Sequence, residues 1–593
     1  MTAISAPAAA APPLQAPSTS FPPDEASRWR RIRRYAVPQW MIEQAAERRL
    51  AGDWRGACGA AGIDIAFDLA DVAREHGRKI VTVLEDDLRH FAPDLLRWHL
   101  PRLGDGRTTI NPNQVVVLGG YGGGRRSRRP DTPRLYVTTP GWMPDGPQRL
   151  TLRFGRVARV DESRRFWPGT VENWTAARHL WDVRHTIELR ERCGGGADRA
   201  PFLNPDGTPR ATDELPTTAP GLTDPAARTE WVTALHERGE VEAAFAAAGI
   251  DLNPLAPDLE YGSVQVLEPL ERMPLALTRL GPEIQRLADE GHGDRFLLHP
   301  FERWRIAMLF ERKRRNGGLR AQCIELDEVP DVVLPEACWR RSPDLDLLRI
   351  GQISPDHLHP LVRDALFPDR PATGGPVGPP EAEPPSPVRV RCRGEWHEMS
   401  FRDGTLHTQH GDEEEQRERA MSAFGGTISG CFAVQRTWTS GIGRLPRALR
   451  DQWRELFARI QHGDTPGVIR LLDAGVDPHA RDGRRRTLLH LLHLLDHEPL
   501  LPRLLAAGLD IEATDKDHRT PLHVAVGENG SAELIRALLT AGARIDVVDP
   551  DSGLSVHYLS VRGKRRDLRF LEERLERDHP DLCTASAFLK EHA

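Results

Sequence analysis

The segment TPLHVAVGENGSAELIRALLTAGAR, residues 520–544, decides how the C-terminal quarter of the chain folds. Thr520 is a favourable N-cap residue, and Pro521 suits the first helical turn because no amide donor is needed there. Leu522 and Ala525 are expected to bury against neighbouring units, and the small Ala525 lets helices approach closely. The segment therefore predicts a short capped helix followed, after GENGS, by a second apolar helix.

The same pattern recurs along the chain with one period. TLLHLL begins at Thr487 and LSVHYL at Leu554, and the histidines of the three copies, His490, His523 and His557, recur about every 33 residues. LLDAGVD, LLAAGLD and LLTAGAR recur in phase with them. The glycines predicted to end these second helices in a left-handed conformation are Gly475, Gly508 and Gly542. Two motifs that share one period predict repeated helix–turn–helix units.

These motifs resemble the ankyrin repeat family over about residues 451–585. The resemblance implies a C-terminal α-helical ankyrin solenoid over 446–585, with about three to four repeats including degenerate caps. It gives a structural role to the Thr-Pro-Leu-His positions, with the histidine hydrogen-bonding inside its turn. It also implies that the stack binds a partner protein through finger tips and a concave helix face, without a cofactor.

The fingers between the predicted helix pairs read RDGRRR, DKDHR and DPDSG. The candidate partner-binding residues are Arg481, Arg484, Arg485, Arg486, Asp515, Lys516, Asp517, His518, Arg519, Asp549 and Asp551. Four arginines make the first finger strongly basic, which suits an acidic patch on the partner. The alternative for each arginine is a solvated charged turn.

Composition narrows the class of protein. The 593 residues carry a formal net charge of -6, so a global basic field that would attract nucleic acid is excluded. No apolar run reaches the roughly 18 residues that a membrane span needs. Seven scattered cysteines without CxxC spacing indicate a reducing cytoplasm, with neither a disulfide framework nor a readable zinc finger. The near absence of lysine resembles the coding bias of ankyrin-repeat proteins from high-GC actinobacteria.

Local patterns predict a multidomain layout with a mixed α+β N-terminal region. The expected segments are a disordered Ala/Pro-rich tail (1–27), an α+β domain (28–185), a mostly helical domain (186–368), a Pro-rich linker (369–388), a short β-element (389–445), the ankyrin repeats (446–585) and a tail (586–593). Within the helical domain, PFERWRIAMLFERKRR (300–315) is expected to form an amphipathic helix. A weak internal echo links LAGDWRGACGAAGIDI (50–65) with ERGEVEAAFAAAGIDL (237–252), which either two copies of one unit or two similar alanine-rich helices would produce.

Candidate chemistry in the sequence is weak. The stretch NQVVVLGGYGGGRRSRRP (113–130) has Gly119 and Gly124 at phosphate-loop spacing, but Arg125 and Arg126 stand where Lys-Ser/Thr belongs. The dinucleotide fingerprint also fails at Arg125, and no helix follows, so a basic loop joining two strands is expected.

We assign no metal site from the histidines in the sequence. His407 and His410 could bind a metal with Asp412, although a structural or exposed role is the preferred interpretation. His490, His493 and His497 are expected on one helix face. We therefore predict no catalytic, cofactor-binding or metal-binding residue.

The resulting hypothesis favours a cytoplasmic scaffold or adaptor protein over an enzyme. One alternative is an enzyme or nucleotide-binding protein with its activity in residues 28–368, targeted by the repeats. A second alternative is a nucleic-acid-associated regulator that uses the arginine- and tryptophan-rich stretches near 28–34 and 304–315.

Overall fold

The structure is a computed structural model of the chain. It describes residues 21–102, 110–122, 132–141, 146–157, 170–221, 223–255, 265–299, 306–313, 318–325, 332–371, 378–379, 381–402, 404–424, 428–549, 553, 555–563 and 565–582. Gly124, Arg125 and Arg126 of the glycine-rich loop, Asp551 of the third finger and most of the two predicted tails lie outside these residues.

The chain divides into two compact units, each assembled from separate segments. The first unit comprises Met1–Arg30, Val117–Arg134 and Val171–Gly375. The second comprises Arg31–Val116, Leu135–Thr170 and Pro376–Ala593. The contiguous domain boundaries expected from the sequence remain a prediction.

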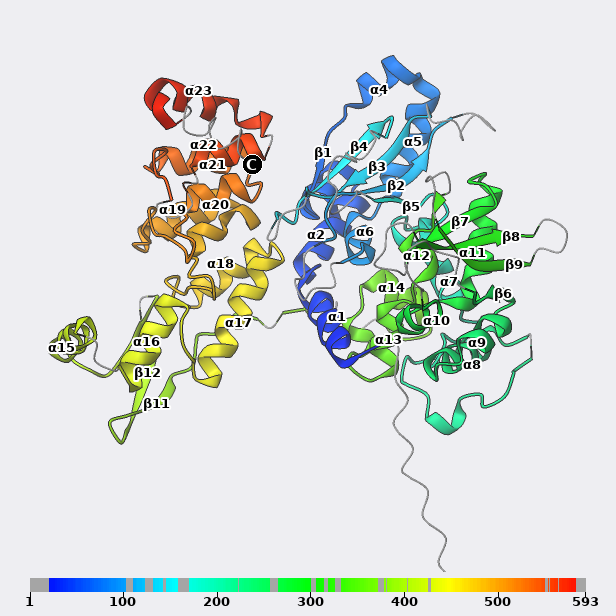
Figure 1. Cartoon of the computed structure of the whole chain (residues 1–593), viewed down its shortest axis with the longest axis horizontal. Helices are drawn as coiled ribbons and strands as arrows, with labels where there is room; N and C mark the ends of the chain where they lie inside the picture. Colours follow the sequence, from blue (N-terminus) through cyan, green and yellow to red (C-terminus); the bar gives the residue numbers. More distant parts are fainter. Residues whose placement is uncertain are drawn as a thin grey trace, which may run out of the picture. The chain divides into compact units, whose positions relative to one another are not determined.

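A five-stranded sheet with the order β1-β4-β3-β2-β5 follows the N-terminal helices (Figure 1). Its β2 begins in the apolar run of the glycine-rich stretch, whose residues Gln114 to Gly119 are all buried. The next described strand is β3, and residues 123–131, on which the expected basic loop falls, lie outside the described residues. The elements are α1 (Pro23–Tyr35), α2 (Gln39–Leu50), α3 (Trp54–Ala60), β1 (Ile63–Ile65), α4 (Leu69–His76), α5 (Arg78–His90), α6 (Pro93–His99), β2 (Gln114–Gly120), β3 (Arg134–Thr138), β4 (Leu150–Gly155) and β5 (Thr170–Asn173).

A second five-stranded sheet repeats this topology, with the order β10-β7-β8-β9-β6. In each copy a helix pair leads into an edge strand that runs parallel to the fourth strand: Ile63 pairs with Leu150, and Ile250 pairs with Leu319. The elements here are α8 (Pro225–Glu237), α9 (Val241–Ala247), β6 (Ile250–Asn253), α10 (Leu267–Arg272), α11 (Leu277–Asp289), β7 (Arg295–Leu298), β8 (Ile306–Arg312), β9 (Leu319–Glu325) and β10 (Val332–Val333).

The sequence echo falls on equivalent positions of these two copies. Gly52 and Gly239 have φ of 76° and 78°, and Gly62 and Gly249 have φ of 67° and 82°. In each copy the first glycine lies between the paired helices and the second directly precedes the edge strand. The structure therefore supports an internal duplication of an α/β unit, the first of the two explanations for the echo.

The amphipathic helix predicted over 300–315 is wrong where the structure describes it, because residues 306–312 form strand β8. Five consecutive residues from Ile306 to Phe310 are buried, since the strand lies between β7 and β9 and its sheet is covered on both faces at this point. A short continuous apolar run cannot distinguish a buried strand from a buried helix by its periodicity. The segment 186–368 is accordingly a mixture of helix and sheet.

Short helices complete the first unit, and some of them pack against the second sheet. Met308, Phe310 and Leu319 of that sheet share a hydrophobic core with Ile284 and Cys338 of the adjoining helices. The remaining elements up to residue 367 are η2 (Arg178–Leu180), η3 (Thr186–Glu188), α7 (Leu189–Arg192), η4 (Thr212–Glu214), α12 (Glu336–Trp339), α13 (Pro343–Arg349), η5 (Pro355–His357) and α14 (Pro360–Leu366).

The C-terminal segment of the second unit starts with a small antiparallel sheet, β11-β12-β13, and continues in helix pairs that follow one another from α17 to α23 (Figure 1). Val390 and Met399 of the sheet share one hydrophobic core with Leu456, Leu522 and further leucines of the helix pairs. The elements are β11 (Val388–Cys392), β12 (Glu395–Arg402), β13 (Thr405–His407), α15 (Asp412–Ala423), α16 (Gly430–Ser440), α17 (Arg447–Gln461), α18 (Thr465–Asp473), η6 (Leu488–Leu494), α19 (His497–Ala506), α20 (Pro521–Gly527), α21 (Ala532–Thr540), α22 (Val556–Arg562), η7 (Arg566–Leu568) and α23 (Arg569–Asp578).

Among the described residues we find no helix with the length and apolarity that a bilayer crossing requires.

Candidate partner-binding surface

Each Thr-x-x-His segment begins an inner helix and ties it to the following finger. Nδ1 of His523 lies 2.8 Å from Oγ1 of Thr520, and its Nε2 lies 3.0 Å from the carbonyl oxygen of Val547. His490 repeats this arrangement with Thr487 at 2.8 Å and the carbonyl oxygen of Arg519 at 3.0 Å. One imidazole therefore closes its own turn and fixes the next finger.

Burial keeps these two imidazoles neutral. The exposed fractions of His490 and His523 are 1% and 0%. Burial lowers the pKa of His490 to about 4, and it also lowers the pKa of His523. Both rings are therefore neutral at physiological pH, with one nitrogen as donor and the other as acceptor.

The second helices of the pairs end at the predicted glycines. Gly475, Gly508 and Gly542 have φ of 96°, 86° and 103°. A side chain at these positions would meet open space, so backbone conformation and not crowding requires the glycine. Pro466 lies in the first turn of α18, where proline is compatible with a helix.

An aspartate–arginine clamp closes each of the first two fingers. Oδ1 of Asp482 accepts the backbone N–H of Arg486 at 2.9 Å, and Oδ2 accepts its Nε–H at 2.7 Å. Asp515 holds Arg519 in the same way, at 2.9 Å to the backbone nitrogen and 3.0 Å to Nε. Charge-assisted bonds of this kind are strong when partly buried, so they fix the shape of the finger.

The tips of the two fingers also share a strained position. Arg485 and His518 occupy the same place in successive repeats and have φ of 63° and 55°, in the left-handed region that few residues other than glycine adopt. Both side chains are exposed. The aspartate–arginine clamp holds the turn in this conformation and so compensates the backbone strain.

Three of the predicted partner-binding side chains are not available at the surface. Arg486, Asp515 and Asp549 are only 6%, 1% and 4% exposed. Arg486 and Asp515 are occupied by the finger clamps described above. Their charges stabilise the fingers and do not face a partner.

The tips that remain exposed are mainly basic. Arg485, Lys516, Asp517 and His518 are exposed, and Arg481, Arg484 and Arg519 are half-buried. Nη1 of Arg481 donates to the carbonyl oxygens of Arg485 and Thr514, at 3.0 and 3.1 Å, and so joins the first finger to the second. Burial, together with the charge of Arg485, lowers the pKa of Arg481.

The concave face implied by the resemblance is not open at the two central repeats. Residues 488–494 of η6 and 521–526 of α20 are all buried. His493 lies in η6 and His497 begins α19 after a break, so the expected common helix face of His490, His493 and His497 does not exist. The fingers are therefore the better candidate for a docking surface.

The N-terminal residues Tyr35 and Trp40, which belong to the second unit, contact the end of α17 and the loop between α17 and α18. The Tyr35 hydroxyl donates to Oε2 of Glu455 at 2.5 Å, and Nε1–H of Trp40 donates to Oδ1 of Asp464 at 2.8 Å. The Tyr35 ring also stacks on His462. This edge of the helix pairs is thus occupied by the chain itself.

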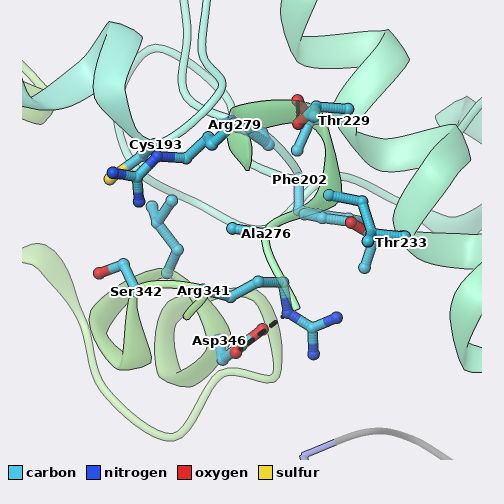
Figure 2. Close-up of a pocket in the computed structure, with 13 residues that line it drawn as sticks. Cys193, Phe202, Thr229, Thr233, Ala276, Arg279, Arg341, Ser342 and Asp346 are labelled. Atoms are coloured by element: carbon cyan, nitrogen blue, oxygen red, sulfur yellow. Dashed lines mark hydrogen bonds and ion pairs between the residues drawn. The ribbon is translucent and has the colours of Figure 1, made fainter. Parts of the chain in front are cut away.

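One cavity of the first unit is small. Figure 2 shows Cys193, Thr229, Arg341 and Asp346 around it, with Nε of Arg341 3.4 Å from Oδ2 of Asp346. Its volume of about 30 Å³ is room for roughly one water molecule, far below the several hundred Å³ of a ligand pocket. Burial raises the pKa of the Cys193 thiol to about 11, so this thiol is protonated at neutral pH.

The structure does not bring together the metal-ligand candidates His407 and His410 that the sequence suggested. His407 is exposed on β13 and does not belong to the group that His410 forms. His410 instead joins Cys392, His397 and Cys431, a group that sequence reasoning missed because its members come from four separate stretches.

Comparison with known proteins supports the repeat assignment. Residues 456–549 match the family described as "Ankyrin repeats (3 copies)". This part of the chain consists of ankyrin repeats. The match confirms the resemblance seen in the sequence and covers none of the N-terminal region. No curated protein matches the chain.

Proposed function

We propose that the chain is an adaptor or scaffold protein that binds a partner protein through the tips of its ankyrin fingers. Ankyrin repeats generally mediate protein–protein interaction, and no cofactor is needed for this role. The proposal extends to a C-terminal solenoid in which the helix pairs present their fingers side by side.

The observation that carries the proposal is the sorting of charge within the fingers. The carboxylates of Asp482 and Asp515 are turned inward, at 8% and 1% exposure, while Arg485 and Lys516 are exposed. The backbone N–H of Lys516 donates to the carbonyl oxygen of Arg484 at 2.9 Å, which places the two tips next to each other. The exposed basic side chains of the two tips therefore lie along one edge, with Asp517 among them, and the complement of this edge is an acidic patch on the partner.

Paired pull-downs with the full-length chain test this proposal. The bait is compared with R484E/R485E, which reverses the tip charge without removing Arg481 or either clamp. A matched control, R447E/R454E, reverses two arginines on α17 whose side chains are 89% and 65% exposed. We expect a partner with an acidic surface that is lost with the finger variant, kept with the control, and released as salt is raised.

The decisive comparison is between the finger variant and the wild-type chain. A partner that binds the finger variant and the wild-type chain equally, with no dependence on salt, would show that the finger tips are not the docking surface. Circular dichroism of each variant establishes that loss of capture reflects the surface and not unfolding.

A further inference from the structure

Two cysteines and two histidines meet at the base of the small sheet. They are Cys392 at the end of β11, His397 on β12, His410 just before α15, and Cys431 in the first turn of α16. One sulfur or nitrogen atom from each residue lies within 4.8 Å of the corresponding atom of every other. Cys392 and Cys431 are 2% and 0% exposed.

The register of the β11–β12 hairpin brings Cys392 and His397 to the same face. Cys392 pairs with Glu395, and His397 pairs with Val390. Because side chains alternate between faces along a strand, Cys392 and His397 are diagonal neighbours on the buried face. The intervening residues 393 and 394 have φ of 52° and 94°, as in the tight two-residue turn that joins such strands.

Gly430 lets the second cysteine approach the first. Its φ is 62°, and a Cβ at this position would lie 2.4 Å from Sγ and 2.8 Å from Cβ of Cys392. Only glycine permits this approach, which sets the start of α16 directly against the end of β11. Cys431 is the next residue in the chain, so the same close approach places its side chain in the cluster.

A carboxylate orients the His410 ring. Nδ1 of His410 lies 2.9 Å from Oε2 of Glu414, in the first turn of α15. A carboxylate only accepts, so Nδ1 carries the proton and Nε2 presents a lone pair. Nε2 lies 3.5 Å from Sγ of Cys392 and 3.0 Å from Nδ1 of His397. Second-sphere carboxylates orient the histidines of metal sites in this manner.

We propose that Cys392, His397, His410 and Cys431 bind one Zn²⁺ ion as a closed structural site. Two thiolates and two imidazoles are a ligand set that selects zinc over hard cations. Metal–ligand bonds of about 2.0 to 2.3 Å in a tetrahedron place neighbouring ligand atoms roughly 3.3 to 3.8 Å apart. The Cys392–His410 and His397–His410 distances are already close to these values. On binding, each thiol releases its proton to solvent, and the histidines bind as neutral rings.

The surroundings of the cluster fit a structural ion. The Phe432 ring lies 4.5 Å from the His410 ring and provides an apolar wall on one side. Four protein ligands fill a tetrahedral shell, so no position is left for substrate. The β11–β12 hairpin carries two of the four ligands, and a two-stranded hairpin is only marginally stable on its own. Zinc would tie this hairpin to α16, and through the shared core to the ankyrin repeats.

Metal analysis of the full-length chain tests the site. The protein is purified without chelators, incubated with Zn²⁺, desalted, and measured by inductively coupled plasma mass spectrometry. We expect about one zinc per chain and a loss of at least tenfold in C392S/C431S. Two controls should keep their zinc: H407N, which changes an exposed histidine of the same sheet, and C323S, which changes a buried thiol of the first unit.

Cobalt substitution keeps the test independent of the folding of any variant. The wild-type chain loaded with Co²⁺ should show the intense visible bands of a tetrahedral site and a thiolate-to-cobalt charge-transfer band. A zinc content below about one tenth per chain, or full zinc content in C392S/C431S, would overturn the proposal. A Cys392–Cys431 disulfide in freshly prepared protein would overturn it as well, because the four residues would then be a covalent link and a hydrogen-bonded histidine pair.

Discussion

Acid is expected to open the ankyrin repeats locally, because His490 must be neutral in the folded chain. Its Nδ1 accepts the backbone N–H of Thr487 at 3.1 Å, and its Nε2 faces the carbonyl oxygen of Arg519 at 3.0 Å. Since a carbonyl only accepts, the single ring proton is on Nε2. A second proton on Nδ1 would point at the Thr487 amide and remove the acceptor that closes the turn.

The magnitude follows from the pKa of His490, which burial lowers from 6.5 to about 4. Above pH 6.5 both the folded and the unfolded chain hold a neutral ring, so the full stability is present. As the pH falls below 6.5 the unfolded chain binds a proton first, and stability is lost until the pH reaches about 4. At about 1.36 kcal/mol for each pKa unit, roughly 3 kcal/mol is lost over this range. The lowered pKa of His523 acts with the same sign.

Hydrogen-exchange mass spectrometry of the full-length chain measures this loss. At pH 4.5, after correction for intrinsic exchange, peptides that contain residues 487–494 should open about 100-fold more often than at pH 7, because two pH units separate 4.5 from 6.5. In H490Q this acid-induced factor should largely disappear, although the variant starts less stable at pH 7. H518Q, at an exposed finger tip, should keep the factor. Equal acid-induced opening in H490Q and the wild-type chain would refute the reasoning.

Three further predictions come from single contacts. Burial raises the pKa of Glu172 to about 8, so folding loses stability as the pH rises from 4.5 towards 8; E172Q should raise the melting temperature at pH 8.5 but hardly at pH 5, and an equal shift at both would contradict this. D515A removes the finger clamp and should lower the free energy of unfolding by about 1 to 3 kcal/mol in urea titrations, against nearly zero for D517A, whose side chain is 49% exposed. G430A should lower both the melting temperature and the zinc content, because its Cβ would collide with Cys392; a variant with wild-type zinc content would contradict this.

The ankyrin repeats could be predicted from the sequence because their signals are local and periodic. Thr520, Pro521 and His523 lie within one turn, and Thr487 and His490 repeat this turn one period earlier. A cap, a first-turn proline and a left-handed glycine act within a few residues of backbone. The fold of the repeats depends little on distant parts of the chain, so short stretches of sequence were enough to predict it.

The N-terminal sheets could not be predicted in the same way, because strand order is a long-range property. Strand β1 pairs with β4 although Ile63 and Leu150 are far apart in the sequence, and the run Ile306 to Phe310 is a strand only because β7 and β9 enclose it. The echo around Gly62 and Gly249 was the one local trace of the duplication. These glycines could be recognised in the sequence because each needs a positive φ, whereas the four strands that follow the edge strand in each copy carry no shared motif.

The cysteine–histidine cluster was missed for a related reason. Its ligands follow the spacing C-x4-H-x12-H-x20-C, which has no CxxC or HxxxH element to signal a metal. The hairpin register and the close approach at Gly430 create the cluster, and neither can be read from spacing. The available signal was the tight turn at residues 393–394 between a cysteine and a histidine on one strand face.

The fingers show why a count of charged residues is a poor guide to a binding surface. RDGRRR and DKDHR suggest two tips of different character, one basic and one mixed. In the structure Asp482 and Asp515 each bind the arginine four positions later. Asp482, Arg486 and Asp515 are buried as a result, and Arg519 is half-buried. The tips that remain are more alike than the sequence implies, because the mixed second finger keeps Lys516 and Asp517 exposed and loses Asp515 to its clamp. A partner that recognises this edge contacts the charges that the clamps leave exposed, so clamp variants should change its affinity even though no clamp residue touches it.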